Sequence, residues 1–164
     1  MEQYDKAIDG LAACIAALFD QAMLVAEDYW NFVNKMEGRQ TGRDSKSSLQ
    51  LSCQLKGNHI EAKWSGIKWY GQKASRYSLR VPIPKSKTTS SYAKNKLKEF
   101  AKEWEWEKVC EAEEKLTAIR RQQHHVVRAI LLIKASKKLS ESAPTIDSPD
   151  ADFHEQEANI SGEK

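Results

Sequence analysis

The chain has 164 residues, of which 40% are hydrophobic and 30% charged, and it carries a formal net charge of +3 at pH 7. These values are near the averages for globular proteins, and the length suits one domain that buries its own core without disulfides or metal. The three cysteines lie far apart with no CxxC spacing, which argues against a zinc site and predicts buried thiols in a reducing cytoplasm.

The N-terminal part of the chain predicts one long amphipathic helix. Apolar residues from Tyr4 to Met36 recur at alternating intervals of four and three residues, and no proline interrupts them. Such a narrow apolar seam requires a partner helix. The longest uncharged apolar stretch, Gly10 to Phe19, is too short to span a bilayer, and no cationic segment precedes it. We therefore expect a soluble, cytoplasmic protein without a membrane segment.

Residues Leu49 to Val81 predict a three-stranded antiparallel meander with an apolar underside. Apolar and polar residues alternate from Leu49 to Lys56 and again from Ile60 to Trp64, as they do in half-buried strands. Gly57-Asn58 lies between these two runs and suits a tight turn. Pro82 and Pro84 end the third run, because proline cannot donate to a strand ladder.

The apolar phase of the second run shifts by one residue after Ser65-Gly66, which predicts a β-bulge. With this bulge, the inward-facing residues would include Ile67, Trp69, Tyr77, Leu79 and Val81. The outward-facing residues would be Lys68, Tyr70, Arg76, Ser78 and Arg80. The meander would then be apolar beneath and basic above.

Residues Ser91 to Lys138 predict a second, longer helix. Its apolar seam shifts between Trp104 and Val109, as in a coiled-coil stutter. A helix of this length would extend beyond the first one. The overhang, with Val126 to Ile133, would offer a seam for a homodimer; a break near His124-His125 is the alternative.

Together these elements predict an α+β domain over residues 1–139. A long N-terminal helix and a long C-terminal helix form an antiparallel hairpin, and the three-stranded antiparallel meander lies at one end of it. From Glu141 to Lys164 there are seven acids and one lysine, a local net charge of −6. We expect residues 140–164 to form a disordered acidic tail, because they bury too little apolar surface to offset their ordering entropy.

The middle of the chain is strongly basic. From Lys56 to Lys102 there are twelve lysines or arginines and two acids, a local net charge of +10. Clustered cations give salt-dependent affinity for phosphates, a β-ribbon can enter the major groove, and an exposed ring can stack on a base. We expect double-stranded DNA, with RNA left open, to contact Lys56, Lys63, Lys68, Tyr70, Lys73, Arg76, Ser78, Arg80, Lys85, Lys87, Lys94 and Lys96. The alternative is that these lysines only solvate an exposed sheet and protect its edges.

No catalytic residue, metal site or cofactor is expected from the sequence. Glu61-x-Lys63 is similar to the Glu-x-Lys with which a nuclease family holds a metal ion, but the only nearby upstream acid is Asp44, in a connector. The four histidines are dispersed along the chain, so the three-histidine cluster of a relaxase is not expected. A metal-dependent nuclease that uses Glu61 and Lys63 is the least favoured alternative.

Several short features recur in an order that resembles a known family. They are the Gly57-Asn58 turn, Lys63-Trp64, Arg76-Tyr77, the run Phe100 to Glu105, and Glu113-Glu114 with Arg120. From Leu49 to Arg121 the chain resembles the MobI-type auxiliary mobilisation proteins of integrative conjugative elements and plasmids. This resemblance implies a small non-relaxase protein that acts at the origin of transfer and helps the relaxase to start DNA processing. It implies no catalytic residues.

A protein–protein adaptor is the main alternative function. Such a coiled-coil protein, for example an anti-restriction or regulatory factor, would use the predicted overhang of the second helix. The basic face of the meander would then be incidental.

Overall fold

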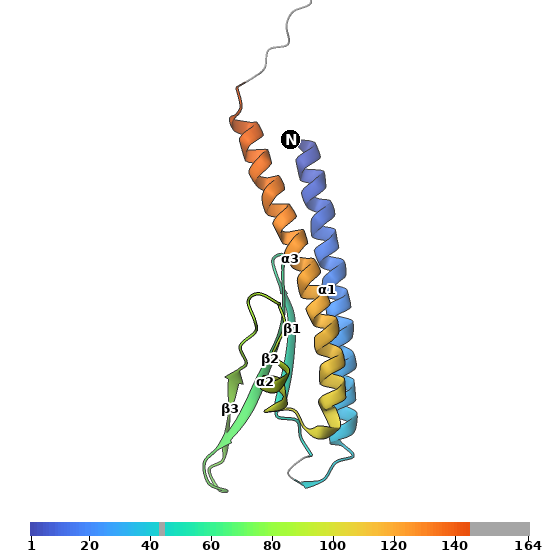
Figure 1. Ribbon diagram of the computed structural model, residues 1–164, viewed down its shortest axis with the longest axis vertical. Helices are drawn as coiled ribbons and strands as arrows, with labels where there is room; N and C mark the ends of the chain where they lie inside the picture. Colours follow the sequence, from blue (N-terminus) through green and yellow to red (C-terminus); the bar gives the residue numbers. More distant parts are fainter. Residues whose placement is uncertain (43–44, 145–164) are drawn as a thin grey trace, which may run out of the picture.

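The computed structural model describes residues 1–42 and 45–144. Its elements are α1 (Glu2–Glu37), β1 (Leu49–Lys56), β2 (His59–Tyr70), β3 (Tyr77–Pro82), α2 (Lys94–Lys98), the 3-10 helix η2 (Glu103–Glu105) and α3 (Trp106–Ser142). The two long helices lie side by side, and the sheet covers the half of this pair that contains the start of α3 (Figure 1). The predicted α+β architecture is confirmed. Of the predicted acidic tail, Ser140 to Ser142 belong to α3, and residues 145–164 lie outside the described part.

The helices α1 and α3 are antiparallel and pack along most of their length. The core between them and the sheet includes the predicted seam residues Ile15, Leu18, Ala22 and Tyr29. At the far end of the pair, Lys137 donates to Asp5 (2.6 Å). The predicted overhang is therefore absent, since α1 accompanies α3 almost to its end. Residues of the proposed dimer seam pack inside this chain instead. Ile130 is buried, and Val126 and Val127 pack against the core.

The second helix begins later than predicted. After the five-residue helix α2 the chain turns, and Glu105 Oε1 accepts the backbone N–H of Lys102 (2.9 Å). This carboxylate satisfies a donor that has no partner inside a helix, as a capping residue does. The shift in apolar spacing after Trp104 therefore marks the start of α3 at Trp106, not a stutter. From there α3 continues without a break through His124 and His125.

The three strands form a sheet of order β1-β2-β3, with both pairs antiparallel. Leu49 pairs with Gly66, and Gly66 in turn pairs with Val81, with no residue skipped in either ladder. The predicted bulge is wrong. Gly66 has another role: a Cβ at this position would lie 2.3 Å from the Phe100 ring. The glycine allows this ring to pack directly on the strand backbone.

Without the bulge, the second half of β2 presents its other face to solvent. Ile67 and Trp69 lie on the outer face of the sheet, and Lys68 and Tyr70 lie on the side of the helices. The predicted orientation of these four residues is wrong, because each is shifted by one position in the pleat. The name outer face is used for the side of the sheet on which Lys63 and Arg80 lie.

The expected burial of the thiols needs correction, and the expected absence of a membrane segment stays a prediction. Cys14 is exposed and the other two cysteines are half-buried, so the thiols are not all in the core. By length and composition alone, α1 is apolar enough to cross a membrane, although its longest uncharged stretch is short. A core helix can meet the same criteria, and α1 packs on α3 and on the sheet.

We predict opposite effects for two glycine-to-alanine substitutions. Gly66→Ala should lower the free energy of unfolding by about 1–3 kcal/mol, because the new methyl group overlaps the Phe100 ring. Gly10→Ala, in an uncrowded part of α1, should raise it by about 0.5–1 kcal/mol. Urea denaturation of both variants measures these changes. A neutral Gly66→Ala would contradict the register.

Candidate nucleic-acid interface

A buried ion pair between Glu113 and Arg120 joins α3 to the sheet. Nη1 and Nη2 of Arg120 donate to the two carboxylate oxygens of Glu113, at 2.9 and 3.2 Å. The same carboxylate accepts hydrogen bonds from the Trp64 indole (2.7 Å), the backbone N–H of Tyr92 (2.8 Å) and the Thr117 hydroxyl (3.0 Å). Five donors compensate its desolvation, as a buried charge requires.

Side chains of α3 also cover the upper edge of β2, where β3 does not reach. Arg120 Nη2 donates to the carbonyl of Ala62 (3.1 Å), and Gln123 Oε1 accepts the backbone N–H of Ile60 (3.2 Å). Arg120 Nη1 also donates to the carbonyl of Ser90 (3.1 Å). The edge of β2 is thereby protected from pairing with another strand. The loop after β3 is held beside it.

A second buried carboxylate, Glu105, ties α1 to the start of α3. It is fully buried and accepts hydrogen bonds from the Tyr29 hydroxyl (3.2 Å) and the Ser47 hydroxyl (2.7 Å). Burial raises the pKa of Glu105 above its usual value, and it also raises the pKa of Tyr29. These contacts fix the lower end of the helical pair and the connector that leads into β1.

Glu61 lies on the outer face near the start of β2, and it holds two of the predicted DNA-contacting lysines. Its carboxylate pairs with Lys56 (2.8 Å) and with Lys63, and Gln54 donates to it as well. The hydrogen bonds from Lys56 and Lys63 lower the pKa of Glu61 from 4.5 to about 2. The carboxylate therefore organises this cluster of lysines and cancels part of its charge.

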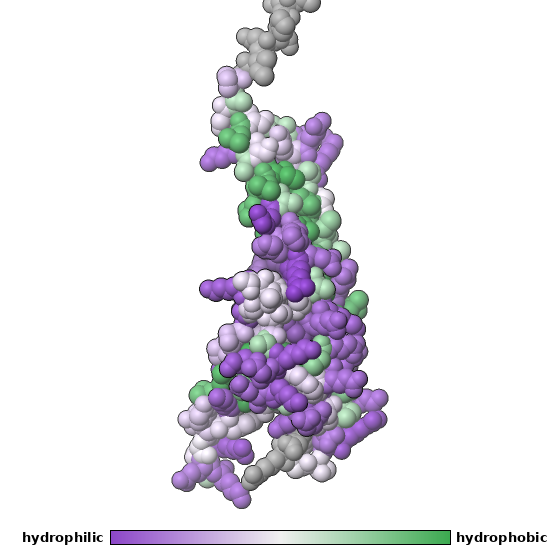
Figure 2. Space-filling view, in the orientation of Figure 1, coloured by the Kyte–Doolittle hydropathy of each residue, from purple (hydrophilic) through white to green (hydrophobic). Residues whose placement is uncertain are grey.

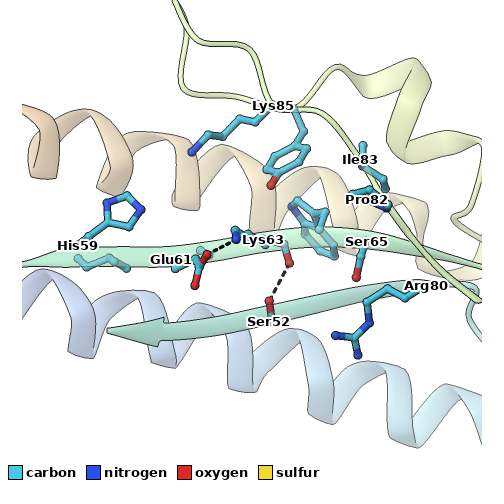
Figure 3. Close-up of a pocket in the computed structure, with 13 residues that line it drawn as sticks. Ser52, His59, Glu61, Lys63, Ser65, Arg80, Pro82, Ile83 and Lys85 are labelled. Atoms are coloured by element: carbon cyan, nitrogen blue, oxygen red, sulfur yellow. Dashed lines mark hydrogen bonds and ion pairs between the residues drawn. The ribbon is translucent and has the colours of Figure 1, made fainter. Parts of the chain in front are cut away.

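A groove on the outer face collects three of the predicted cations. It lies between β2 and the loop after β3, and Lys63, Lys85 and Arg80 all line it. Figure 3 shows Lys63 on β2 and Lys85 on the loop above it, with Arg80 nearer the other end of the groove. Burial, followed by the nearby charge of Arg120, lowers the pKa of Lys85. A bound phosphate would find three cations here and one acid, Glu61, which is already paired.

Beyond Gly66 the sheet narrows to a ribbon of two strands, because β1 begins only at Leu49, opposite this residue. We call Ile67 to Arg80 the β-ribbon. It bends away from the helical pair at the lower end of the molecule (Figure 1). Gly71 shapes its turn, with a φ of +87° and too little room for a Cβ beside the Ser75 carbonyl. Lys73 lies in the same turn.

The β-ribbon exposes aromatic rings on both faces. On the outer face, Trp69 is 54% exposed, and the Arg76 guanidinium lies 5.4 Å from its ring centre. On the other face, Tyr70 and Tyr77 form a stacked cross-strand pair, with ring centres 5.9 Å apart. The neighbouring Leu79 is 51% exposed. The expected burial of Tyr77 and Leu79 is therefore wrong, because the helices do not reach this far.

All twelve predicted contact residues are exposed, but they do not share one face. Lys56, Lys63, Ser78 and Arg80 lie on the outer face of the strands. Lys68 is on the opposite face, 5.9 Å from the centre of the Phe100 ring. The remaining lysines, Lys87, Lys94 and Lys96, follow in the loop and in α2. The cations are spread along both faces of the sheet, from the turn after Lys56 to the β-ribbon, and do not form one flat surface. Figure 2 shows the region of the sheet as mostly hydrophilic.

The residues considered for metal chemistry do not converge. Within the described residues no group of three His, Cys, Asp or Glu side chains is placed to hold a metal ion. Glu61 is paired with two lysines, and Asp44 lies outside the described part. His124 and His125 are neighbours on α3, and His59 contacts Gln123. The geometry gives the Glu-x-Lys motif a role in organising charge.

Exposed leucines lie at the other end of the molecule, two of them inside the stretch Val126 to Ile133 that the sequence suggested as a dimer seam. Leu131, Leu132 and Leu139 on α3 are each more than half exposed, and Figure 2 shows hydrophobic surface on the upper part of the helical pair, above the sheet. Leu24 on α1 is similarly exposed. Four consecutive apolar residues, Ile130 to Ile133, indicate this surface in the sequence, because one side of a helix can bury only some of them. Of the four, only Ile130 is buried.

Comparison with known protein families identifies the family of this chain. A family model described as MobI protein matches residues 18–134, which is more than half of the chain and includes both networks and the β-ribbon. The chain belongs to the MobI family. It is thus a mobilisation-related accessory protein, as the resemblance implied. None of the curated proteins and none of the solved structures matches it.

The motifs that pointed to the MobI family have structural roles in this member. Trp64, Glu113 and Arg120 form the buried ion-pair network, Phe100 packs on Gly66, and Glu105 caps the turn before α3. These residues hold together the fold of this chain. The cations and rings of the β-ribbon are a separate feature, and they are the candidate site.

We predict that the two neighbouring glutamates of α3 respond differently to substitution. Glu113→Ala should lower the free energy of unfolding by about 3–5 kcal/mol, because it leaves Arg120 charged and buried without its partner. Glu114→Ala, an exposed neighbour, should change it by less than about 0.5 kcal/mol. Chemical denaturation compares the two. Similar effects for both variants would contradict the assigned network.

We also predict a pH signature of Glu61. Its pKa is lowered from 4.5 to about 2 in the folded protein, so its ionised form stabilises the fold fully above about pH 4.5. This contribution should be lost as the pH falls from about 4.5 to about 2. Denaturation of the wild type and of Glu61→Gln across this range tests it. The difference in stability should shrink toward low pH, and a constant difference would be inconsistent with the lysine cluster.

Proposed function

We propose that this MobI-family protein binds double-stranded DNA at the origin of transfer and assists the relaxase there, in the cytoplasm. The observation that carries the proposal is the basic lower half of the sheet, with the β-ribbon at its end. Between Glu61 and Glu99 the chain contains no acid, and ten lysines or arginines lie there. Counterion release makes such a segment favourable for binding a polyanion.

The geometry suggests how the contacts divide. A ribbon of two strands has the width that fits a DNA groove, and Arg76, Ser78 and Arg80 lie along it. Lys63 and Lys85 line the groove of Figure 3 and lie outside the β-ribbon. We expect these two lysines to contact phosphates. Phosphate contacts position a protein, and contacts to base edges specify the sequence. We assign phosphate contacts alone to the groove. To the β-ribbon we assign contacts to the bases together with phosphate contacts through Arg76 and Arg80.

The proposed protein partners are the relaxase and a second copy of the chain. The exposed leucines Leu131, Leu132 and Leu139 give the upper end of α3 an apolar surface. This surface also supports the alternative function, a protein–protein adaptor whose basic face is incidental. The two functions differ in one respect, because an adaptor needs no salt-sensitive affinity for DNA.

We predict that Arg76→Ala combined with Arg80→Ala weakens DNA binding. The slope of log affinity against log salt should fall by roughly 2, one for each lost phosphate contact. The circular dichroism melt should stay nearly unchanged, because both side chains are exposed. Gel shift or fluorescence anisotropy at several salt concentrations, with duplex from the origin of transfer and with random duplex, measures the effect.

The matched control removes two charges elsewhere. Arg128→Ala with Lys134→Ala, both exposed on α3, should leave the affinity and its salt dependence within about twofold of the wild type. Equal losses in both double variants would show an unspecific charge effect and would contradict the proposed interface. A wild-type protein that gives no salt-sensitive shift at all would favour the adaptor.

A further inference from the structure

The rings at the end of the β-ribbon are placed unlike the other large aromatic side chains of the fold. Tyr29 and Trp64 are buried and pack edge to face in the core. Trp69, Tyr70 and Tyr77 are 54%, 43% and 55% exposed. Exposed rings that gather at one site usually mark a binding surface, because their apolar area favours burial against a partner.

The arrangement of the rings suits flat partners. Tyr70 and Tyr77 stack with an angle of 24° between their planes, so another planar group can extend the pair at either end. Trp69 lies on the opposite face, with the Arg76 guanidinium beside its ring. A guanidinium next to an indole can bind a phosphate while the ring contacts the attached base.

The positive charges around the rings favour nucleic acid as the partner over an apolar protein segment. Lys68, Lys73, Arg76 and Arg80 lie in or beside the β-ribbon, and no acid occurs from Ala62 to Lys98. A protein partner would have to supply many carboxylates as well as apolar groups. A strand of nucleic acid carries both a phosphate and a flat base in each nucleotide, so it can contact the cations and the rings together.

We propose that the β-ribbon of this protein stacks its exposed rings on unpaired bases, so that it prefers DNA with a locally opened duplex over fully paired DNA. In a closed duplex the bases are stacked on one another, and an exposed ring reaches them only where a base step opens. Trp69 and the Tyr70–Tyr77 pair are the stacking groups. Arg76 and Arg80 hold the neighbouring phosphates. This inference rests on the proposed DNA binding and adds the state of the DNA that is recognised.

The test compares three fluorescent DNA probes of one sequence: a duplex, the same duplex with a central bubble of mismatched bases, and the single top strand. Fluorescence anisotropy should show that the wild type binds the bubble about tenfold more tightly than the duplex, which is the effect of about one stacked base. Trp69→Ala with Tyr77→Ala should reduce this preference to about twofold or less. It should leave duplex affinity nearly unchanged, because the cations remain.

Two further variants separate stacking from folding and from general loss of apolar surface. Trp69→Phe with Tyr77→Phe keeps the rings and should keep most of the preference. Leu131→Ala with Leu132→Ala removes similarly exposed apolar side chains from α3 and should keep the wild-type ratio of bubble to duplex affinity. Equal affinity of the wild type for all three probes would overturn the stacking proposal and leave the proposed DNA binding intact.

The remaining outcomes are also decisive. If the alanine double variant keeps the bubble preference, the rings do not contact the bases, and the inference is wrong. If the wild type binds none of the probes, the proposed function itself fails. In that case the β-ribbon would have to serve a protein partner.

Discussion

The carboxylate of Glu113 fixes the positions of three parts of the molecule relative to one another. It binds Arg120 on its own helix, the Trp64 indole on β2 and the backbone of Tyr92 in the loop after β3. Removing one partner of a buried pair costs far more than an exposed pair contributes. This network therefore sets how the sheet lies on α3, and with it the position of the basic groove and the β-ribbon.

The same arrangement leaves the end of the sheet free. Side chains of α3 cover the edge of β2 as far as Ala62, Phe100 covers Gly66, and nothing in the described part of the chain covers the rings that follow. A rigid half of the sheet thus holds a ribbon of two strands that is open on both faces. Rigid elements place a binding site more precisely than loops do, which suits the proposed role of positioning DNA for the relaxase.

The sequence was sufficient to predict the order of the elements and most of the core, because period-two and heptad patterns reflect burial directly. It was misleading where a glycine or a carboxylate had a long-range role. Gly66 suggested a bulge, but it makes room for Phe100, a residue distant in the sequence. Glu105 looked like part of a long helix, but its contacts with Ser47 and Tyr29 place it at a turn. The exposure of the β-ribbon on both faces could not be predicted. It depends on where the helices stop covering the sheet, and this is a matter of tertiary packing.

Hydrogen–deuterium exchange of the protein, with and without DNA from the origin of transfer, tests the central claim most directly. We expect slower exchange on DNA binding in Ile67 to Arg80 and in the loop around Lys85. Little change is expected in the upper halves of α1 and α3, where Leu131 and Leu132 lie. Protection confined to those upper halves, with an unchanged β-ribbon, would contradict the claim.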